Sequence, residues 1–167
     1  RAAAGLFSFA QAAIDAESFS ETGRVSEPRE GKPYIEHVAC GVPFAGHEVA
    51  ILDEHGNALP AGFEGEICHR GASVTPGYFG NPDATAQSWR HGWLRTGDLG
   101  FLHEGQLYVT GRIKDLIIVN GRNVHPQAVE WAVAEVDGVR RGNVVAFSVP
   151  GELGEELDHG VDDGRIR

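Results

Sequence analysis

The sequence contains no methionine and only two cysteines among its 167 residues. Arg1 stands at the position where a newly translated chain carries methionine, so we expect the sequence to be a piece of a longer protein. Two cysteines, Cys40 and Cys68, are too few for a disulfide framework or for a zinc site. We therefore expect two reduced, half-buried thiols in a cytosolic protein.

Positive charge and long apolar runs are also scarce. Lys and Arg total 14 against 24 Asp and Glu, which gives a formal net charge of -10. A chain of this charge repels nucleic-acid phosphates, which argues against nucleic-acid binding as its main role. No run of 18 apolar residues is present, so we expect no transmembrane segment. The 41% hydrophobic and 23% charged content is typical of a globular chain.

Motifs of several enzyme classes are missing. The sequence has no GxxxxGK[ST] or GxGxxG phosphate-binding loop and no GxSxG motif of a serine nucleophile. Its eight histidines are scattered, without the spacing of metal ligands. Hydrolase and metal-site interpretations therefore have no positive support in these residues.

Two kinds of pattern divide the chain. Short segments with strand character come first, at 48–52, at 65–70 and in a hairpin at 93–113. The later elements follow the order strand, helix, strand, at 116–119, from Pro126 onward and at 144–149. We therefore expect a mixed α/β (α+β) fold with a domain boundary near Lys114.

Other segments carry weaker or more local signals. Periodicity within 1–19 does not separate one helix from a strand followed by a short helix. Charged residues, glycines and prolines in 21–33 indicate a surface loop. Asn81 followed by Pro82 predicts the start of a short helix. Residues 151–167 are charged and glycine-rich, with no alternating apolar set, and are expected to be loop or disordered.

An acid and a base lie at neighbouring strand ends of the expected hairpin, each beside a glycine. Asp98 follows Gly97, and Arg112 follows Gly111. A carboxylate can accept hydrogen bonds from both hydroxyls of a sugar diol, and a guanidinium can donate to the same oxygens. The glycines allow a ligand to approach the backbone. A turn aspartate and a surface ion pair would leave the same pattern, so the spacing leaves both interpretations open.

Several motifs, in order, resemble those of the adenylate-forming enzymes, the superfamily of acyl-CoA synthetases, peptide-synthetase adenylation domains and luciferases. The resemblance runs from about Val38 to Val149. Its motifs are Gly-Glu-Ile to Gly-Tyr-Phe at 65–79, Gly-Trp-Leu-Arg-Thr-Gly-Asp-Leu-Gly at 92–100, and the segments 108–118 and 121–126.

Within that superfamily, the chain is most similar to the fatty acyl-AMP ligases. The similarity rests on the Gly-Arg-Asn-Val-His-Pro loop at 121–126 and on residues 140–148. Fatty acyl-AMP ligases carry an extra segment before the block that corresponds to 38–43. Residues 14–36 resemble that segment in position and character.

The resemblance implies an architecture and a set of site residues. Residues 1–113 would be the C-terminal part of the large adenylation domain, with its distorted β-barrel subdomain. Residues 114–167 would be the truncated start of the small α/β domain. Asp98 and Arg112 would bind the ribose of ATP and acyl-AMP. Lys114 would be the hinge between the two half-reactions.

The resemblance also implies a reaction. A fatty acid would attack the α-phosphorus of MgATP to give acyl-AMP and pyrophosphate. The acyl group would then pass to the phosphopantetheine thiol of an acyl carrier protein or, in the alternative of a fatty acyl-CoA synthetase, to CoA. ATP and Mg²⁺ are the expected cofactors, and the cytoplasm is the expected location.

The same resemblance places the metal ligands and the adenylation lysine outside these residues. We therefore expect no catalytic residue and no metal ligand here, and an inactive protein if the 167 residues are isolated. Two other classes stay open. One is a non-catalytic relative that serves as a scaffold for a partner, and the other is an interaction module without a nucleotide site.

Overall fold

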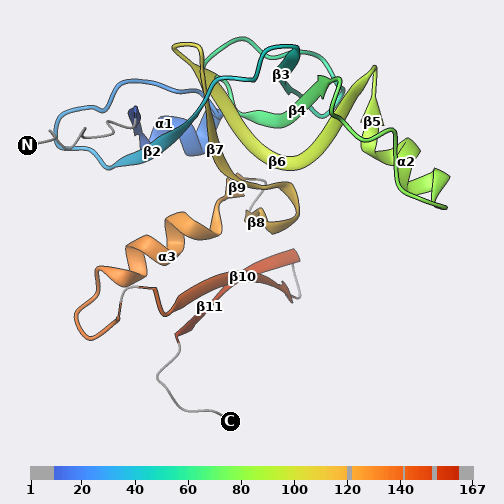
Figure 1. Cartoon of the computed structure of the whole chain (residues 1–167). Coiled ribbons are helices and arrows are strands. Elements are labelled where there is room, and N and C mark those ends of the chain that lie inside the picture. The colour runs from blue at the N-terminus through green and yellow to red at the C-terminus, as the bar shows by residue number, and fades with distance from the viewer. Residues whose placement is uncertain (1–9, 120–121, 141, 152–153, 162–167) are drawn as a thin grey trace, which may run out of the picture. The chain divides into compact units, whose positions relative to one another are not determined.

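The computed structural model describes residues 10–119, 122–140, 142–151 and 154–161 (Figure 1). Its mixed content of strands and helices, dominated by strands, confirms the expected fold class. The chain divides into two compact units, Arg1–Thr110 and Gly111–Arg167. That these units belong to the large and small domains of a longer enzyme, with the boundary between residues 113 and 114, stays a prediction.

Among the described residues, the first unit is built on one seven-stranded sheet. The strand order is β1-β2-β7-β6-β4-β3, with β5 beside β6. The strands are β1 (Gln11–Asp15), β2 (Tyr34–Gly41), β3 (His47–Leu52), β4 (Gly65–Gly71), β5 (Trp89–Arg90), β6 (Trp93–His103) and β7 (Gln106–Arg112). Strand β6 lies between β7 and β4 and curves along its length in Figure 1. The strand segments predicted from alternation are therefore present.

Periodicity within 1–19 left open either one helix or a strand followed by a short helix. The described part of this segment has the second arrangement. Strand β1 is followed by the short helix α1 (Ala16–Thr22). Asp15 caps this helix by accepting a hydrogen bond from the Ser18 backbone N–H at 2.8 Å. The helix ends at Gly23, whose φ of 64° is accessible mainly to glycine.

The core of the first unit joins this segment to the sheet. Its cluster consists of Ala12, Ile14, Phe19, Phe101 and Tyr108. The ring of Phe19 meets that of Phe101 edge-on at 5.8 Å, and Phe101 stacks on Tyr108 at 5.0 Å. Because Phe101 and Tyr108 lie on the β6–β7 hairpin, the segment around α1 packs onto the same hairpin that carries the candidate site.

Two local predictions of the first unit are confirmed. The expected hairpin is formed by β6 and β7, and its turn residues Glu104 and Gly105 have φ angles of 49° and 76°. Such positive values are typical of tight hairpin turns. The expected short helix is α2 (Pro82–Ser88), capped by the Asn81 side chain, which accepts from the Ala84 N–H at 3.0 Å.

The second unit contains the predicted order of strand, helix and strand. Its elements are the 3₁₀ turn η1 (Ile113–Asp115), β8 (Ile117–Val119), β9 (Arg122–Val124), α3 (Pro126–Ala134), β10 (Val144–Gly151) and β11 (Gly154–Val161). Strand β8 pairs antiparallel with β9, and β10 pairs antiparallel with β11. Asn120 and Gly121 lie outside the described residues.

The expectation of loop or disorder after Gly151 is wrong for residues 154–161. Strand β11 pairs with β10 from Gly151↔Gly154 to Val144↔Val161. Strand β10 is apolar and rich in β-branched residues. Because pairing depends on the neighbouring strand as much as on intrinsic propensity, β11 can pair with β10 without apolar alternation of its own. Residues 162–167 lie outside the part that the structure describes.

Candidate functional site

The candidate residue Asp98 lies in an irregular part of β6. In the pairing of β4 with β6, Glu66 is opposite Leu99, whereas Cys68 is opposite Arg95. Residues 96–98 of β6 therefore face only Ile67 of β4, and β6 bulges at this point. Bulges re-aim side chains and are frequent next to active sites. This bulge sets the direction in which Asp98 leaves the sheet.

The residues of the bulge explain why it forms here. Gly97 has a φ of 76°, a conformation that costs little only for glycine. A Cβ atom at Gly97 would meet no described atom within 4 Å, so the backbone conformation and not lack of space requires glycine. The Thr96 hydroxyl donates to the Ile67 carbonyl at 2.7 Å and accepts from the Asp98 N–H at 3.0 Å. Thr96 thus links the turn both to its own Asp98 and to the neighbouring strand β4.

A second carboxylate, that of Glu66 on β4, reaches the same bulge. Its Oε1 accepts from the Gly97 N–H at 3.2 Å, and its Oε2 accepts from Arg95 Nε at 2.7 Å. Glu66 is only 8% exposed, and it lies in the segment 65–70 for which the sequence predicts a strand. Burial does not alternate along this strand, since Glu66, Ile67 and Cys68 are all buried. An acidic residue within this short apolar segment was the available signal for Glu66.

The two thiols differ from the expectation that both are half-buried. Both are free, but Cys68 is fully buried beside Glu66, whereas Cys40 is exposed on β2. Burial, and secondarily the negative charge of Glu66, raises the pKa of Cys68 to about 11. Cys68 is therefore a packing residue of the sheet below the bulge.

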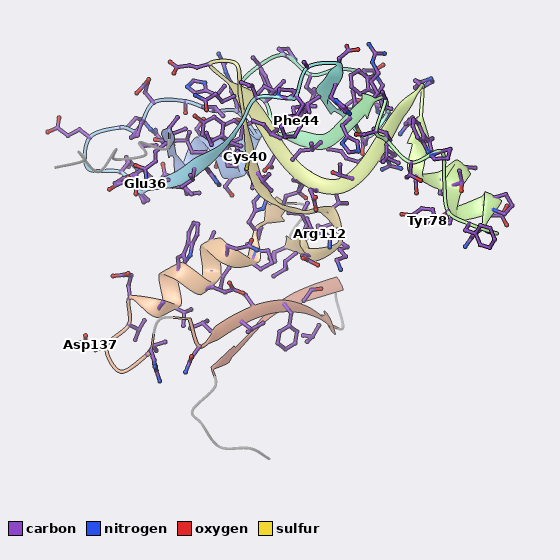
Figure 2. All side chains as sticks on the ribbon, viewed as in Figure 1. Glu36, Cys40, Phe44, Tyr78, Arg112 and Asp137 are labelled. Carbon is purple, nitrogen blue, oxygen red and sulfur yellow. The ribbon has the colours of Figure 1, made fainter. Side chains whose placement is uncertain are left out.

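Arg112 and Lys114 lie where β7 ends. Arg112 is exposed and has an extended backbone, with φ of -126° and ψ of 141° (Figure 2). Lys114 is exposed in the centre of the one-turn 3₁₀ helix η1. Asp98 belongs to the first unit, and Arg112 and Lys114 belong to the second. A ribose site shared by Asp98 and Arg112 therefore stays a prediction, as does the hinge at Lys114.

The described part of the motif at 121–126 contains β9 and the start of α3. His125 occupies the N-cap position of α3, but its side chain makes no capping hydrogen bond. A Cβ atom at Gly111 would lie 3.1 Å from His125 Nδ1, so a glycine at this position lets the imidazole approach the backbone closely. His125 therefore stands at the cap position of α3 without capping the helix through its side chain.

The described ranges contain no group of three or more His, Cys, Asp or Glu residues that could hold a metal ion. They also contain no helix long and apolar enough to cross a membrane. Asp98 is half-buried in the bulge of β6.

Comparison with known proteins gives a family match for part of the chain. The model of the AMP-binding enzymes matches residues 19–79. Proteins named as acyl-CoA synthetases and ligases are similar over a longer stretch of the chain. The chain is 41% identical over 147 residues to the "Putative acyl-CoA synthetase" of Caulobacter vibrioides, in an alignment that covers 86% of this chain and 26% of that protein.

Solved structures similar to this chain agree with it in fold. A structure from studies of fatty acyl-adenylate ligases of E. coli and L. pneumophila superposes with a TM-score of 0.80 and 34% identity, over 92% of this chain and 27% of that one. The ATP-bound RpMatB-BxBclM chimera B3 superposes with a TM-score of 0.67 and 35% identity, over 74% of this chain and 25% of that one. The chain thus spans about a quarter of the length of these relatives.

Proposed function

We propose that this chain is part of an ATP-dependent, AMP-forming acid ligase, in which it holds the ribose of ATP and of the acyl-AMP intermediate. The observation that carries the proposal is the bulge at 96–98, which presents Asp98 from a turn fixed by hydrogen bonds. The match of residues 19–79 to the AMP-binding enzymes supports a nucleotide as the ligand.

The bulge suits this task because its backbone is fixed before a ligand arrives. The Asp98 N–H is engaged by Thr96, and the Gly97 N–H is engaged by Glu66. An acceptor that is already in place loses little entropy on binding and positions the α-phosphorus through the sugar. We assign Asp98 the role of accepting hydrogen bonds from the ribose hydroxyls, and Arg112 that of donating to the same sugar.

Lys114 is proposed as the hinge of the ligase. Hinges are commonly a few residues at the end of an element that can absorb a large change in backbone angles. Lys114 meets this description, since it is exposed in a single 3₁₀ turn directly after β7 and next to the division between the two units. The hinge would let the small domain serve adenylation and acyl transfer in turn.

For the substrate we propose a fatty acid, and for the acceptor the phosphopantetheine thiol of an acyl carrier protein. The likeness to the structure from the study of fatty acyl-adenylate ligases supports both proposals. Residues 14–36 support them as well, because they form an ordered segment that packs on the sheet through Phe19. Transfer to CoA is the second candidate, since the Caulobacter vibrioides relative is named as an acyl-CoA synthetase.

The remaining parts of the reaction are assigned to the rest of the ligase. We assign the ligands of Mg²⁺ to parts of the ligase outside these 167 residues. The isolated 167 residues are proposed to be inactive in pyrophosphate exchange, and turnover by this chain alone would contradict that part of the proposal. We place the ligase in the cytoplasm, where ATP and thiol acceptors are available.

The ribose role of Asp98 can be tested in the full-length ligase with Asp98→Asn. Losing hydrogen bonds to a charged acceptor costs about 1.5–3 kcal/mol, so kcat/KM for ATP in pyrophosphate exchange should fall about ten- to hundredfold. The preference for ATP over 3′-deoxy-ATP should also collapse. Asp83→Asn, at an exposed carboxylate in the first turn of α2, serves as the control. Unchanged kinetics in Asp98→Asn would refute the ribose role.

A further inference from the structure

We propose that Glu66 is a positioning residue that, together with Arg95, sets the orientation of Asp98 and thereby the selectivity for an intact ribose. The inference rests on the proposed function and extends it to a residue outside the Thr-Gly-Asp motif. Glu66 lies on β4, and the residues that it holds lie on β6.

The two oxygens of Glu66 bind the bulge at two points. Oε1 accepts from the backbone of Gly97, in the middle of the bulge, at 3.2 Å. Oε2 accepts from the guanidinium of Arg95, which directly precedes the bulge, at 2.7 Å. One rigid carboxylate therefore fixes the start and the centre of the turn relative to each other and to β4.

Burial makes this contact hard to replace with water. The Glu66 side chain is 10% exposed, and its neighbour Cys68 on the same strand is fully buried. The Gly97 N–H is partly buried, and losing its acceptor is costly, so the Gly97 peptide would turn to find another partner. Asp98 follows this peptide directly and would turn with it.

The conformation of Gly97 makes the turn sensitive to Glu66. Glycine at a φ of 76° has wide conformational freedom. On the side where a Cβ would point, the described atoms leave Gly97 unconfined within 4 Å. The bulge is therefore held in shape by the hydrogen bond that Glu66 accepts and by those that Thr96 accepts and donates, and not by side-chain packing on that side.

The pair of Glu48 and Arg70 offers a matched contrast on the same sheet. Arg70 donates to both oxygens of Glu48, at 2.9 and 2.7 Å, between neighbouring strands. Glu48 is directly opposite Arg70 in a regular register, and its side chain is 61% exposed. Glu48 is therefore a carboxylate with a similar arginine partner but no bulge to support.

The test compares Glu66→Gln with Glu48→Gln in the full-length ligase, using pyrophosphate exchange. The glutamine keeps the size of Glu66 but turns an amide NH₂ toward one of the two donors. The readout is the ratio of kcat/KM for ATP to that for 3′-deoxy-ATP, which does not depend on the folded fraction of a preparation. We expect the ratio to fall at least about tenfold in Glu66→Gln, and less than about twofold in Glu48→Gln.

The results for the Glu66 and Asp98 variants test the positioning role and the ribose role separately. A wild-type ratio in Glu66→Gln, together with a collapsed ratio in Asp98→Asn, overturns the positioning role and leaves the ribose role intact. A wild-type ratio in Asp98→Asn overturns the proposed function itself. If Glu66→Gln gives too little protein, Glu66→Asp keeps the charge but shortens the reach by one methylene. The same fall is expected for it, and its absence overturns the inference.

Discussion

Two buried carboxylates in the first unit use the same chemistry for different purposes. Asp15 is 1% exposed and Glu66 is 8% exposed, and each accepts hydrogen bonds from one backbone N–H and from one arginine. The arginine partner of Asp15 is Arg29, which binds both carboxylate oxygens at 2.6 and 2.9 Å. The partners of Glu66 both lie on one neighbouring strand.

The difference lies in what each carboxylate joins. Asp15 ties the N-terminus of α1 to the following loop, which closes the segment between β1 and β2. Glu66 instead joins two strands that are already paired and shapes the bulge between them. From this contrast we expect that loss of Asp15 mainly damages the fold, whereas loss of Glu66 mainly damages the site.

The largest expected effect on stability is that of Asp15→Ala. The substitution removes the cap of α1 and both bonds to Arg29, and we expect the melting temperature to fall by more than about 5 °C. Amide hydrogen exchange should accelerate between residues 16 and 33, and most directly at the Ser18 N–H, which donates a hydrogen bond to Asp15. Thermal unfolding and exchange measured by mass spectrometry check both parts.

Glu17→Ala is the matched control for this prediction. Glu17 also pairs with Arg29, at 2.9 Å, but its side chain is 49% exposed. Exposed ion pairs contribute little to stability, so this variant should melt close to the wild type. Equal melting temperatures for Asp15→Ala and Glu17→Ala would show that the buried Asp15 carboxylate contributes no more to stability than the exposed Glu17 carboxylate, although both pair with Arg29.

A smaller effect is expected from pH. Hydrogen bonds from the Arg29 guanidinium and from the Ser18 backbone hold the pKa of Asp15 well below its ordinary value of 3.8. A carboxyl group with a lowered pKa contributes its full stabilisation above that ordinary value and loses it as the pH falls through the folded-state pKa. The gap in melting temperature between wild type and Asp15→Ala should therefore be constant from about pH 6 to 8 and narrow below about pH 4. A difference in melting temperature that grows as the pH falls would contradict the stabilising role of the ionised Asp15 carboxylate.

The smallest expected effect is a difference in alkylation between two thiols, that of Cys40 on β2 and that of Cys68 on β4. Cys40 is exposed on β2, which pairs with the strand of Asp15 (Figure 2), whereas Cys68 is buried beside Glu66 with its pKa raised to about 11. Because the thiolate is the reactive form, iodoacetamide at about pH 8 should label Cys40 and leave Cys68 unmodified in the folded protein. Mass spectrometry of the native and urea-unfolded protein tests this, with Cys40→Ser as the control. Equal labelling of both thiols before unfolding would show that the sheet beside Glu66 opens.

Much of the first unit could be predicted from local signals. Asn81 and Pro82 mark the start of α2, and Glu104 with Gly105 forms the turn of the hairpin, because capping and turn formation depend on neighbouring residues. The tail was harder to predict. Strand β11 owes its structure to pairing with β10, and its own residues carry no apolar alternation that would reveal it.

The sequence by itself determined the Thr-Gly-Asp turn, since a hydroxyl, a residue free to adopt positive φ and a carboxylate in this order contain the chemistry of the bulge. Only the tertiary structure decided that Glu66 supports it. Strand β6 pairs with β4, about thirty residues earlier in the chain, and that pairing, with its shifted register, brings the Glu66 carboxylate to the Gly97 N–H. Such a contact depends on which strands become neighbours, and no local spacing encodes that choice.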